Sequence, residues 1–273
     1  MAYQDILVHV RPYGSIEPCE VALRLGKRFG ARVTGLYALQ DVAYFKQLMS
    51  ENSAPLRQMI ERDYAAAAEA ETRLRALAEI EGIDFDWQSL EGTAADLIAV
   101  VARLQDLVVV GKTEADDGWG VVERMVTEPG SRPMLVVPST GPFLDVGTCV
   151  LIAWNGSAQA AEAVMRGKSF LTAARRVVVL TGDEEREKLP ANPSRPPLDI
   201  AGYLRRHGIQ AEMRRTNAAS ADAGTAILET ARDVNADLVV MGAFGRSRLR
   251  EWVLGGATRT VLDYMHIPVL MAH

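Results

Sequence analysis

Three short sequence patterns occur twice in this chain of 273 residues, in the same order both times. Each set holds an apolar run, a run that contains Asp-Leu-Val-Val, and a Pro-containing apolar run. The first set is Asp5-Ile-Leu-Val-His-Val10, Gln105-Asp-Leu-Val-Val-Val-Gly111 and Arg132-Pro-Met-Leu-Val-Val137; the second is Cys149-Val-Leu-Ile-Ala-Trp154, Ala236-Asp-Leu-Val-Val-Met-Gly242 and Ile267-Pro-Val-Leu-Met-Ala272. Repetition in order predicts a duplicated domain.

The boundary between the copies is predicted near residue 143. Pro138-Ser-Thr-Gly-Pro142 is rich in turn-forming residues and suits a short linker. The sequence therefore predicts one domain over residues 1–142 and a second over residues 143–273.

Each copy is predicted to be an α/β domain. Short β-branched runs alternate with helical periodicity, a pattern typical of βαβ units and a mostly parallel sheet. Apolar faces that should cover the sheets carry Val21, Ala22, Leu25 and Phe29; Leu97, Ile98 and Val101; Ala161, Val164 and Met165; and Ile227, Leu228, Ala231 and Val234. A long Ala-rich helix is expected from Pro55 to Glu81, and a surface loop from Pro190 to Pro197 before a short helix, Leu198 to His207.

Composition narrows the class of protein. Apolar residues make up 48% of the chain, and 30 basic against 35 acidic residues give a net charge of −5, which argues mildly against nucleic acid as a partner. The N-terminus lacks the pattern of a signal peptide, and no apolar run reaches membrane-spanning length, so we expect a cytoplasmic protein without a membrane partner. Cys19 and Cys149 fit no metal or redox spacing.

A phosphate-binding loop is predicted in the second copy. Gly242-Ala-Phe-Gly245 follows the fourth strand, and Gly255-Gly-Ala-Thr258 leads into an apolar helical pattern that carries Val261, Leu262 and Met265. Glycines let the backbone approach an anion closely, and a helix start adds the positive end of its dipole. Arg246 and Ser247 lie between the glycines and suit phosphate contact or a solvated loop about equally.

Asn155 is the candidate for the nucleoside end of this site. In a doubly wound sheet, ligands lie at the carboxyl ends of the strands where the strand order reverses, here between the first and fourth strands of the copy. Asn155 follows the first strand and can offer a donor and an acceptor to a ribose or base, but Asn before Gly is also an ordinary turn residue. Thr258 can supply a hydroxyl to a phosphate, or it can face the core or solvent.

The spacing Gly242-x2-Gly245-x9-Gly255, the strand that ends at Asn155 and the closing Ile267-Pro-Val-Leu-Met271 resemble the universal stress protein family. The resemblance implies two tandem doubly wound five-stranded domains of the adenine nucleotide alpha hydrolase-like fold, with strand order 3-2-1-4-5. It further implies pairing through the last strand, a homodimer of the tandem chain, and binding of ATP or AMP without an established reaction.

The resemblance also assigns residue roles. Gly242, Gly245 and Gly255 fall on phosphate-contacting glycines, with Gly256, Ala257 and Thr258 following them. Two positions depart from the family pattern: Asn155 stands where an aspartate is usual, and Gly256 where Ser or Thr is usual. Each lost hydrogen bond weakens binding by about 1 kcal/mol, so the backbone cradle is expected to persist.

The first copy is predicted to have lost the site. Gly111 to Gly120 is shorter than its counterpart, and Glu114, Asp116 and Asp117 would repel a phosphate. These acidic residues indicate a solvated loop rather than a metal site, since no further ligands are identifiable. Arg11 stands where the second copy has Asn155.

The sequence thus favours a stress-response regulator or carrier that binds an adenine nucleotide in its second copy. The alternative is an interaction scaffold, or a binder of another small molecule, with vestigial nucleotide sites. No catalytic residue or metal site is identifiable, and the chain is not expected to be an enzyme, with slow ATP hydrolysis left as an open outcome.

Overall fold

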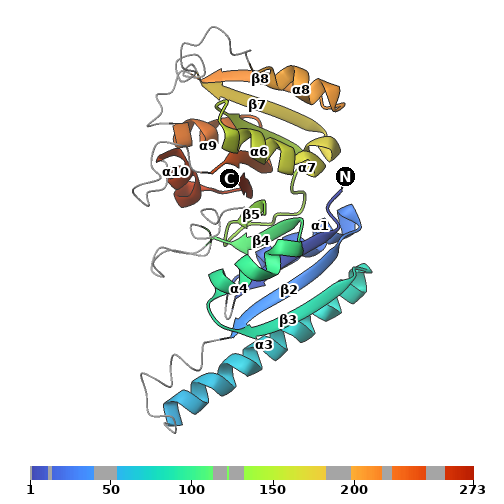
Figure 1. The fold of residues 1–273 in the computed structure, drawn as a ribbon, viewed down its shortest axis with the longest axis vertical. Coiled ribbons are helices and arrows are strands. Elements are labelled where there is room, and N and C mark those ends of the chain that lie inside the picture. The colour runs from blue at the N-terminus through green and yellow to red at the C-terminus, as the bar shows by residue number, and fades with distance from the viewer. Residues whose placement is uncertain are drawn as a thin grey trace. The chain divides into compact units, whose positions relative to one another are not determined.

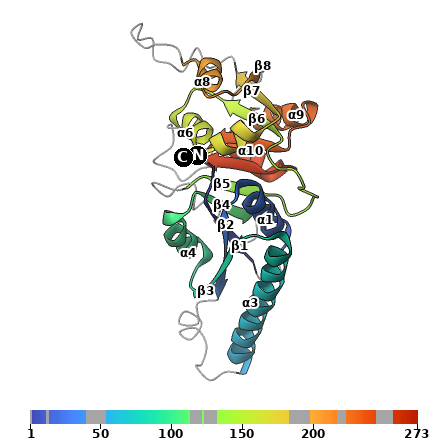
Figure 2. The same ribbon diagram turned by 90° about the vertical axis from the view of Figure 1, so that its right-hand side faces the viewer.

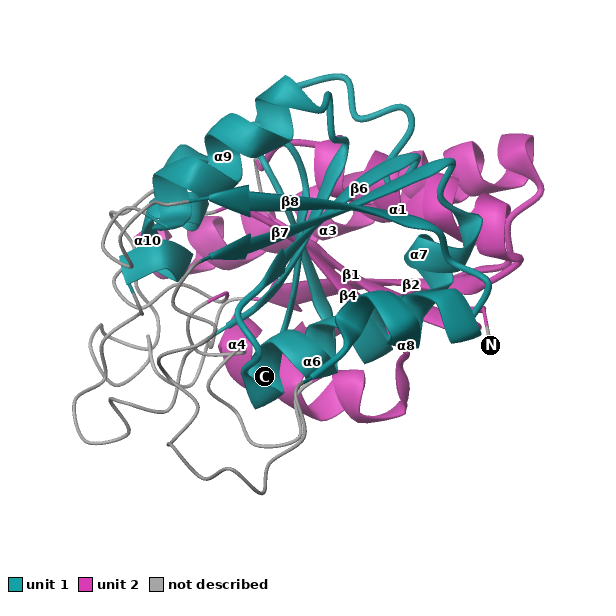
Figure 3. Cartoon of the chain, turned by 90° about the horizontal axis from the view of Figure 1, so that it is seen from above, with its two compact units in different colours: residues 1, 133–273 teal, residues 2–132 magenta. Residues whose placement is uncertain are grey.

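The computed structural model describes residues 2–11, 14–39, 54–112, 122, 132–182, 198–216, 223–243 and 256–273. Its contacts divide the chain into two compact units, residues 2–132 and residues 133–273 (Figure 3). The division falls before Pro133 because the strand that ends the first copy pairs within the second unit. The linker predicted near residue 143 stays a prediction.

The unit of residues 2–132 is a parallel sheet with helices between its strands. The strands lie in the order β3-β2-β1-β4, and all described pairs are parallel. The elements are β1 (Asp5–Val10), α1 (Glu17–Phe29), β2 (Arg32–Leu39), α3 (Ala54–Glu81), β3 (Phe85–Glu91), α4 (Ala94–Val101), η1 (Ala102–Leu104) and β4 (Leu107–Gly111). Helix α3 confirms the long Ala-rich helix expected from the sequence (Figure 1).

The unit of residues 133–273 repeats this arrangement and adds two strands. Its strands lie in the order β8-β7-β6-β9-β10, which confirms the order 3-2-1-4-5, and β5 pairs antiparallel with β10. The elements are β5 (Met134–Val137), β6 (Cys149–Trp154), α6 (Ala158–Arg166), α7 (Lys168–Ala173), β7 (Arg176–Gly182), α8 (Ile200–Arg206), β8 (Ala211–Thr216), α9 (Ala223–Asp233), β9 (Leu238–Gly242), α10 (Gly256–Tyr264) and β10 (Val269–Ala272).

Helices cover both faces of each sheet. In the second unit, α6, α7 and α8 lie on one face and α9 and α10 on the other (Figure 3). In the first unit, α1 and α3 lie opposite α4 (Figure 2). Because βαβ crossovers are right-handed, the helices change face where the chain reverses direction across the sheet. Both units are therefore doubly wound.

The residues of the helical faces predicted from periodicity are buried or half-buried, and Met165 alone among them is exposed. Ile227, Leu228, Ala231 and Val234 are all buried, as are Val261 and Leu262. Met165 was assigned to the covering face of α6, but it is 59% exposed and that assignment is wrong. The buried stripe of α6 is Ala160, Ala163 and Val164, and this i, i+3, i+4 spacing leaves Met165 on the outer side.

The aspartate of the repeated Asp-Leu-Val-Val pattern ties two strands together in each unit. The carboxylate of Asp237 accepts hydrogen bonds from the backbone N–H groups of Gly147, Thr148 and Cys149 at 2.7–3.0 Å, where β6 begins. Asp106 accepts from Gln4 and Asp5 at 2.8 and 3.2 Å, where β1 begins. In both copies, this aspartate thus holds the start of the first strand beside the fourth strand by hydrogen bonds.

Candidate functional site at the carboxyl ends of β6 and β9

Strands β6 and β9 lie side by side at the point where the strand order of the second unit reverses. Strand β6 pairs with β7 on one side and with β9 on the other. The pairing of β6 with β9 runs from Val150 opposite Leu238 to Ala153 opposite Met241. Ligands of doubly wound sheets bind at such a point, beyond the carboxyl ends of the strands. Asn155 and Gly242 lie at this edge, as the sequence predicted.

Asn155 forms the turn that connects β6 to α6. Its Oδ1 accepts a hydrogen bond from the backbone N–H of Ser157 at 3.1 Å, and Gly156 between them has a φ of 69°. The Ser157 side chain then caps α6 by accepting from the N–H of Ala160 at 3.1 Å. Asn155 therefore acts as a turn residue, which was one of its two interpretations. Its side chain is also exposed at the candidate site.

Gly242 is required for the packing of β9 against α6. A Cβ at this position would lie 2.5 Å from the backbone nitrogen of Ala160 and 2.5 Å from the carbonyl carbon of Gln159, both in the first turn of α6. Gly111, its counterpart in the first unit, has a looser contact of the same kind, because a Cβ there would lie 3.0 Å from the Pro18 ring in the first turn of α1. A glycine at the end of the fourth strand thus has a structural reason in both copies.

Helix α10 begins at Gly256 and presents its amino-terminal turn to solvent. Gly256 is exposed, and apart from its chain neighbours and its own helix no described atom lies within 4 Å of the position that a Cβ would take. Ala257 is half-buried, and Thr258 is 5% exposed, which favours the core alternative for Thr258 over a phosphate contact. The backbone N–H groups of this turn are the described groups best suited to an anion.

Other residues predicted for the site lie outside the described residues. These are Gly245, Arg246, Ser247 and Gly255. The structure thus describes both ends of the predicted loop, Gly242 and Gly256, and the nucleoside candidate Asn155.

Trp154 is a residue that sequence reasoning treated only as the end of a strand. It is the last residue of β6 and is 6% exposed, yet its buried indole Nε1 has no hydrogen-bond partner among the residues that the structure describes. Buried polar groups are rarely left unpaired in native proteins. A Trp at the carboxyl end of a strand, next to Asn-Gly, was the available signal.

The corresponding edge of the first unit has different chemistry. Arg11 follows β1 and Lys112 follows β4, so basic side chains flank the equivalent position. Burial, and secondly the nearby Arg11 charge, lower the pKa of His9 in β1 to about 4. The predicted acidic residues Glu114, Asp116 and Asp117 lie outside the described residues. Among the described residues, no group of three His, Cys, Asp or Glu side chains could hold a metal ion.

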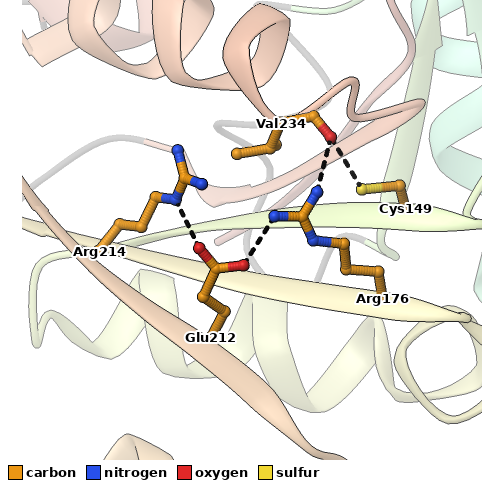
Figure 4. Close-up of polar contacts among 5 residues, drawn as sticks. All are labelled: Cys149, Arg176, Glu212, Arg214 and Val234. Atoms are coloured by element: carbon orange, nitrogen blue, oxygen red, sulfur yellow. Dashed lines mark hydrogen bonds and ion pairs between the residues drawn. The ribbon is translucent and has the colours of Figure 1, made fainter.

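Neither cysteine is part of the candidate site. Burial raises the pKa of the Cys19 thiol to about 12, which keeps it protonated. Cys149 begins β6, at the opposite end of the strand from Asn155, and its Sγ lies 3.5 Å from the carbonyl oxygen of Val234 (Figure 4). Arg176 donates to the same carbonyl oxygen at 3.2 Å and pairs with Glu212, so this network joins β7 to β8 and to the end of α9.

The fold and the position of the site define the second unit as a doubly wound α/β domain with a candidate ligand site at its strand-order reversal. Residues 149–273 match the model of the Universal stress protein family. This half of the chain is therefore a universal stress protein domain. No match was found among curated proteins.

Solved structures share the fold over nearly the whole chain. A universal stress protein from Archaeoglobus fulgidus DSM 4304 is 14% identical, with a TM-score of 0.73 over 98% of this chain and 97% of its own. A functionally unknown protein from Pseudomonas aeruginosa PAO1 is 15% identical, with a TM-score of 0.60 over 99% and 92%. These likenesses show that the tandem α/β architecture occurs in other proteins. Within the described part of the chain, no helix combines the length and apolar character needed to cross a bilayer.

Proposed function

We propose that the second unit binds an adenine nucleotide, ATP or AMP, and that the chain acts through this binding as a stress-response regulator or carrier. The proposal rests mainly on one observation: Asn155 follows β6 and Gly242 ends the neighbouring strand β9, at the strand-order reversal of a universal stress protein domain. The exposed amino terminus of α10 adds backbone donors and the positive end of a helix dipole. Phosphates would bind there, and the nucleoside near Asn155.

The proposed role is binding rather than turnover. Phosphoryl transfer needs a positioned nucleophile and, in most cases, a metal ion that neutralises developing charge. The proposal assigns neither role to a residue. Release of inorganic phosphate from ATP at a steady rate that Asn155→Ala eliminates would contradict this part of the proposal.

Gly256 offers a matched pair of variants to test nucleotide binding. Because no described atom outside its own helix and chain neighbours lies near its Cβ position, a side chain there displaces none of the described residues. Gly256→Ser supplies a hydroxyl at the first turn of α10 and should tighten ATP binding about five-fold, the worth of one hydrogen bond. Gly256→Asp places a carboxylate where phosphate should bind and should abolish binding, although an acidic residue at a helix start favours the helix.

Isothermal titration calorimetry with ATP and AMP measures both effects, and thermal unfolding checks that each variant is folded. Gly242→Ala is a poor test of binding because its Cβ would strike the backbone of α6. Absence of heat for both nucleotides with the wild-type chain contradicts the proposal. So does a Gly256→Asp variant that binds as well as the wild type.

A scaffold without nucleotide is the second candidate. It is favoured by the structural explanations that Asn155 and Gly242 already have, since the first forms a turn and the second admits α6. Mass spectrometry of small molecules released from the purified chain separates the two functions. Stoichiometric ATP or AMP supports the nucleotide carrier, and a different bound compound supports the alternative.

A further inference from the structure

Helix α4 of the first unit carries apolar residues on its outer side as well as on the side that covers the sheet. Its buried residues are Ala95 and Ile98, and Ala102 continues this stripe where η1 begins. The opposite side is apolar too, since Val100 is 56% exposed and Leu104 is 87% exposed. A helix that is apolar all round is normally enclosed by other parts of a protein.

The second unit shows that the fold does not need an apolar outer face at this place. Its helix α9 has the same position in the βαβ order, before the fourth strand. The buried stripes share one spacing: Ala95, Ile98 and Ala102 in α4 and η1, and Gly224, Ile227 and Ala231 in α9. Aligned on these stripes, Val100 corresponds to Glu229, and both are exposed. Leu104 corresponds to Asp233, and both are exposed as well. The fold therefore does not explain the apolar residues of α4.

The apolar surface continues onto the edge strand β3. The Arg75 guanidinium of α3 lies 5.8 Å from the centre of the Phe85 ring, so Phe85 is on the α3 side of the sheet. Leu90 has the opposite parity along β3 and lies on the α4 side, where it is 38% exposed. Leu97 packs beside the turn that follows β3, 3.6 Å from the Cβ position of Gly92. Apolar side chains thus run from the end of β3 along the outer side of α4.

Two charges of opposite sign flank this outer face. Asp96 lies in the first turn of α4, and Arg103 lies about two turns further along, so the two share a side of the helix. Both are exposed. The Asp96 carboxylate accepts from Thr93 Oγ1 at 2.5 Å, and its two oxygens can also receive a guanidinium. The face therefore reads acidic, apolar, basic along the helix, which complements the same face running in the opposite direction.

We propose that this outer face of α4 packs antiparallel against the same face of a second copy of the chain. The proposal is independent of nucleotide binding. In a two-fold interface the same patch must complement itself. A two-fold axis beside Val100 sets Asp96 against Arg103 of the second copy, because these positions lie on either side of residue 100. The same axis sets Leu97 against Leu104 of the second copy.

The charges favour a second copy over a partner of one sign. A uniformly acidic or basic surface would meet a like charge at one end of the face, either Asp96 or Arg103. Nor can a second copy add to the last strand, because β10 already pairs with β9 on one side and β5 on the other. A contact between short helices is small for a protein interface, so we expect association at micromolar concentrations.

A double variant, Val100→Glu with Leu104→Asp, tests the apolar centre of the face. It gives α4 the outer residues that α9 carries, so the chain should stay folded. Sedimentation equilibrium across micromolar concentrations should show a dimer for the wild type, with association at least about ten-fold weaker in the variant, because pairing would bury carboxylates without partners. Met165→Glu is the control, since Met165 is an apolar residue of α6 that is 59% exposed. It should associate like the wild type.

A charge exchange tests the antiparallel arrangement. Arg103→Glu sets two acidic residues against each other and should weaken association about five-fold. Adding Asp96→Lys to the same chain makes the facing charges opposite again and should restore the wild-type association. Thermal unfolding of each variant checks that a change in association does not come from a loss of the fold.

Three results overturn the proposal. A wild-type chain that stays monomeric throughout the micromolar range means that α4 does not bind a second copy. A folded Val100→Glu, Leu104→Asp variant that associates like the wild type places the contact elsewhere in the chain. A folded Arg103→Glu variant that Asp96→Lys fails to restore shows that the two faces do not pack antiparallel.

Discussion

At the scale of single residues, buried titratable groups link the fold to pH. His9 lies in β1 with 7% of its surface exposed, and burial lowers the pKa of its imidazole from 6.5 to about 4. The unfolded chain therefore binds a proton between these two values that the folded chain excludes. The contribution of neutral His9 to the free energy of unfolding is therefore fully present above pH 6.5, and it is lost as the pH falls toward 4.

The His9 contribution can be measured against a variant that lacks the group. Between pH 7 and pH 4 this residue alone should reduce the free energy of unfolding by about 3 kcal/mol, at roughly 1.4 kcal/mol per pKa unit. Urea unfolding of the wild type and of His9→Leu at several pH values gives the difference. Curves that fall in parallel over this range would show that His9 does not titrate as described.

Asp237 predicts a second effect at the residue scale. Its carboxylate receives three successive backbone N–H groups, from Gly147, Thr148 and Cys149, and hydrogen bonds to a charged group are the stronger kind. Asp237→Ala should destabilise the chain by about 2–3 kcal/mol. Asp106→Ala is the matched control in the first unit, because the exposed Asp106 accepts only two such bonds. Denaturant unfolding should show a smaller loss of stability for Asp106→Ala than for Asp237→Ala. If Asp237→Ala lowers the free energy of unfolding by no more than Asp106→Ala does, the role assigned to Asp237 is wrong.

At the scale of elements, the close approach of strand ends to helix starts shapes the site. Gly242 lets β9 end against the first turn of α6, and Gly111 does the same for β4 and α1. The candidate site is thus built on contacts that the fold needs in any case. This is why a glycine at the end of the fourth strand does not by itself indicate a ligand.

A pair of glycine variants tests this packing. Gly242→Ala forces a Cβ against the α6 backbone and should destabilise the chain by about 1–3 kcal/mol, as overpacking does. Gly182, at the end of β7, has no described atom beyond its chain neighbours within 4 Å of its Cβ position and serves as the control. Thermal unfolding should separate the two variants. A Gly242→Ala chain as stable as Gly182→Ala contradicts the close approach.

The elements also show what the sequence could and could not predict. Alternating patterns and the repeat predicted two α/β domains, and the helix from Pro55 to Glu81 was confirmed as α3. The strand order 3-2-1-4-5 was implied by the family resemblance, and the second unit has it. Met165 was misassigned because adjacent apolar residues on a short helix do not reveal which of two neighbouring stripes faces the sheet. Hydrogen bonds at Asn155 and the unpaired nitrogen of Trp154 depend on atomic positions, which periodicity does not contain.

At the scale of the whole molecule, the duplication has left two units with different edges. The second unit carries Asn155 and an open α10 start, whereas the first carries Arg11 and Lys112. We therefore propose nucleotide binding in the second unit alone. The homodimer implied by the family resemblance stays a proposal, for which sedimentation equilibrium across micromolar concentrations should give the mass of two chains. A single-chain mass throughout that range contradicts it.

The stoichiometry of ATP binding tests the central claim most directly. Calorimetric titration of the full chain should give one ATP per chain, and Gly256→Asp should remove it while the protein stays folded. No binding at all, two molecules per chain, or a single molecule that Gly256→Asp leaves unchanged would contradict a nucleotide site at the start of α10.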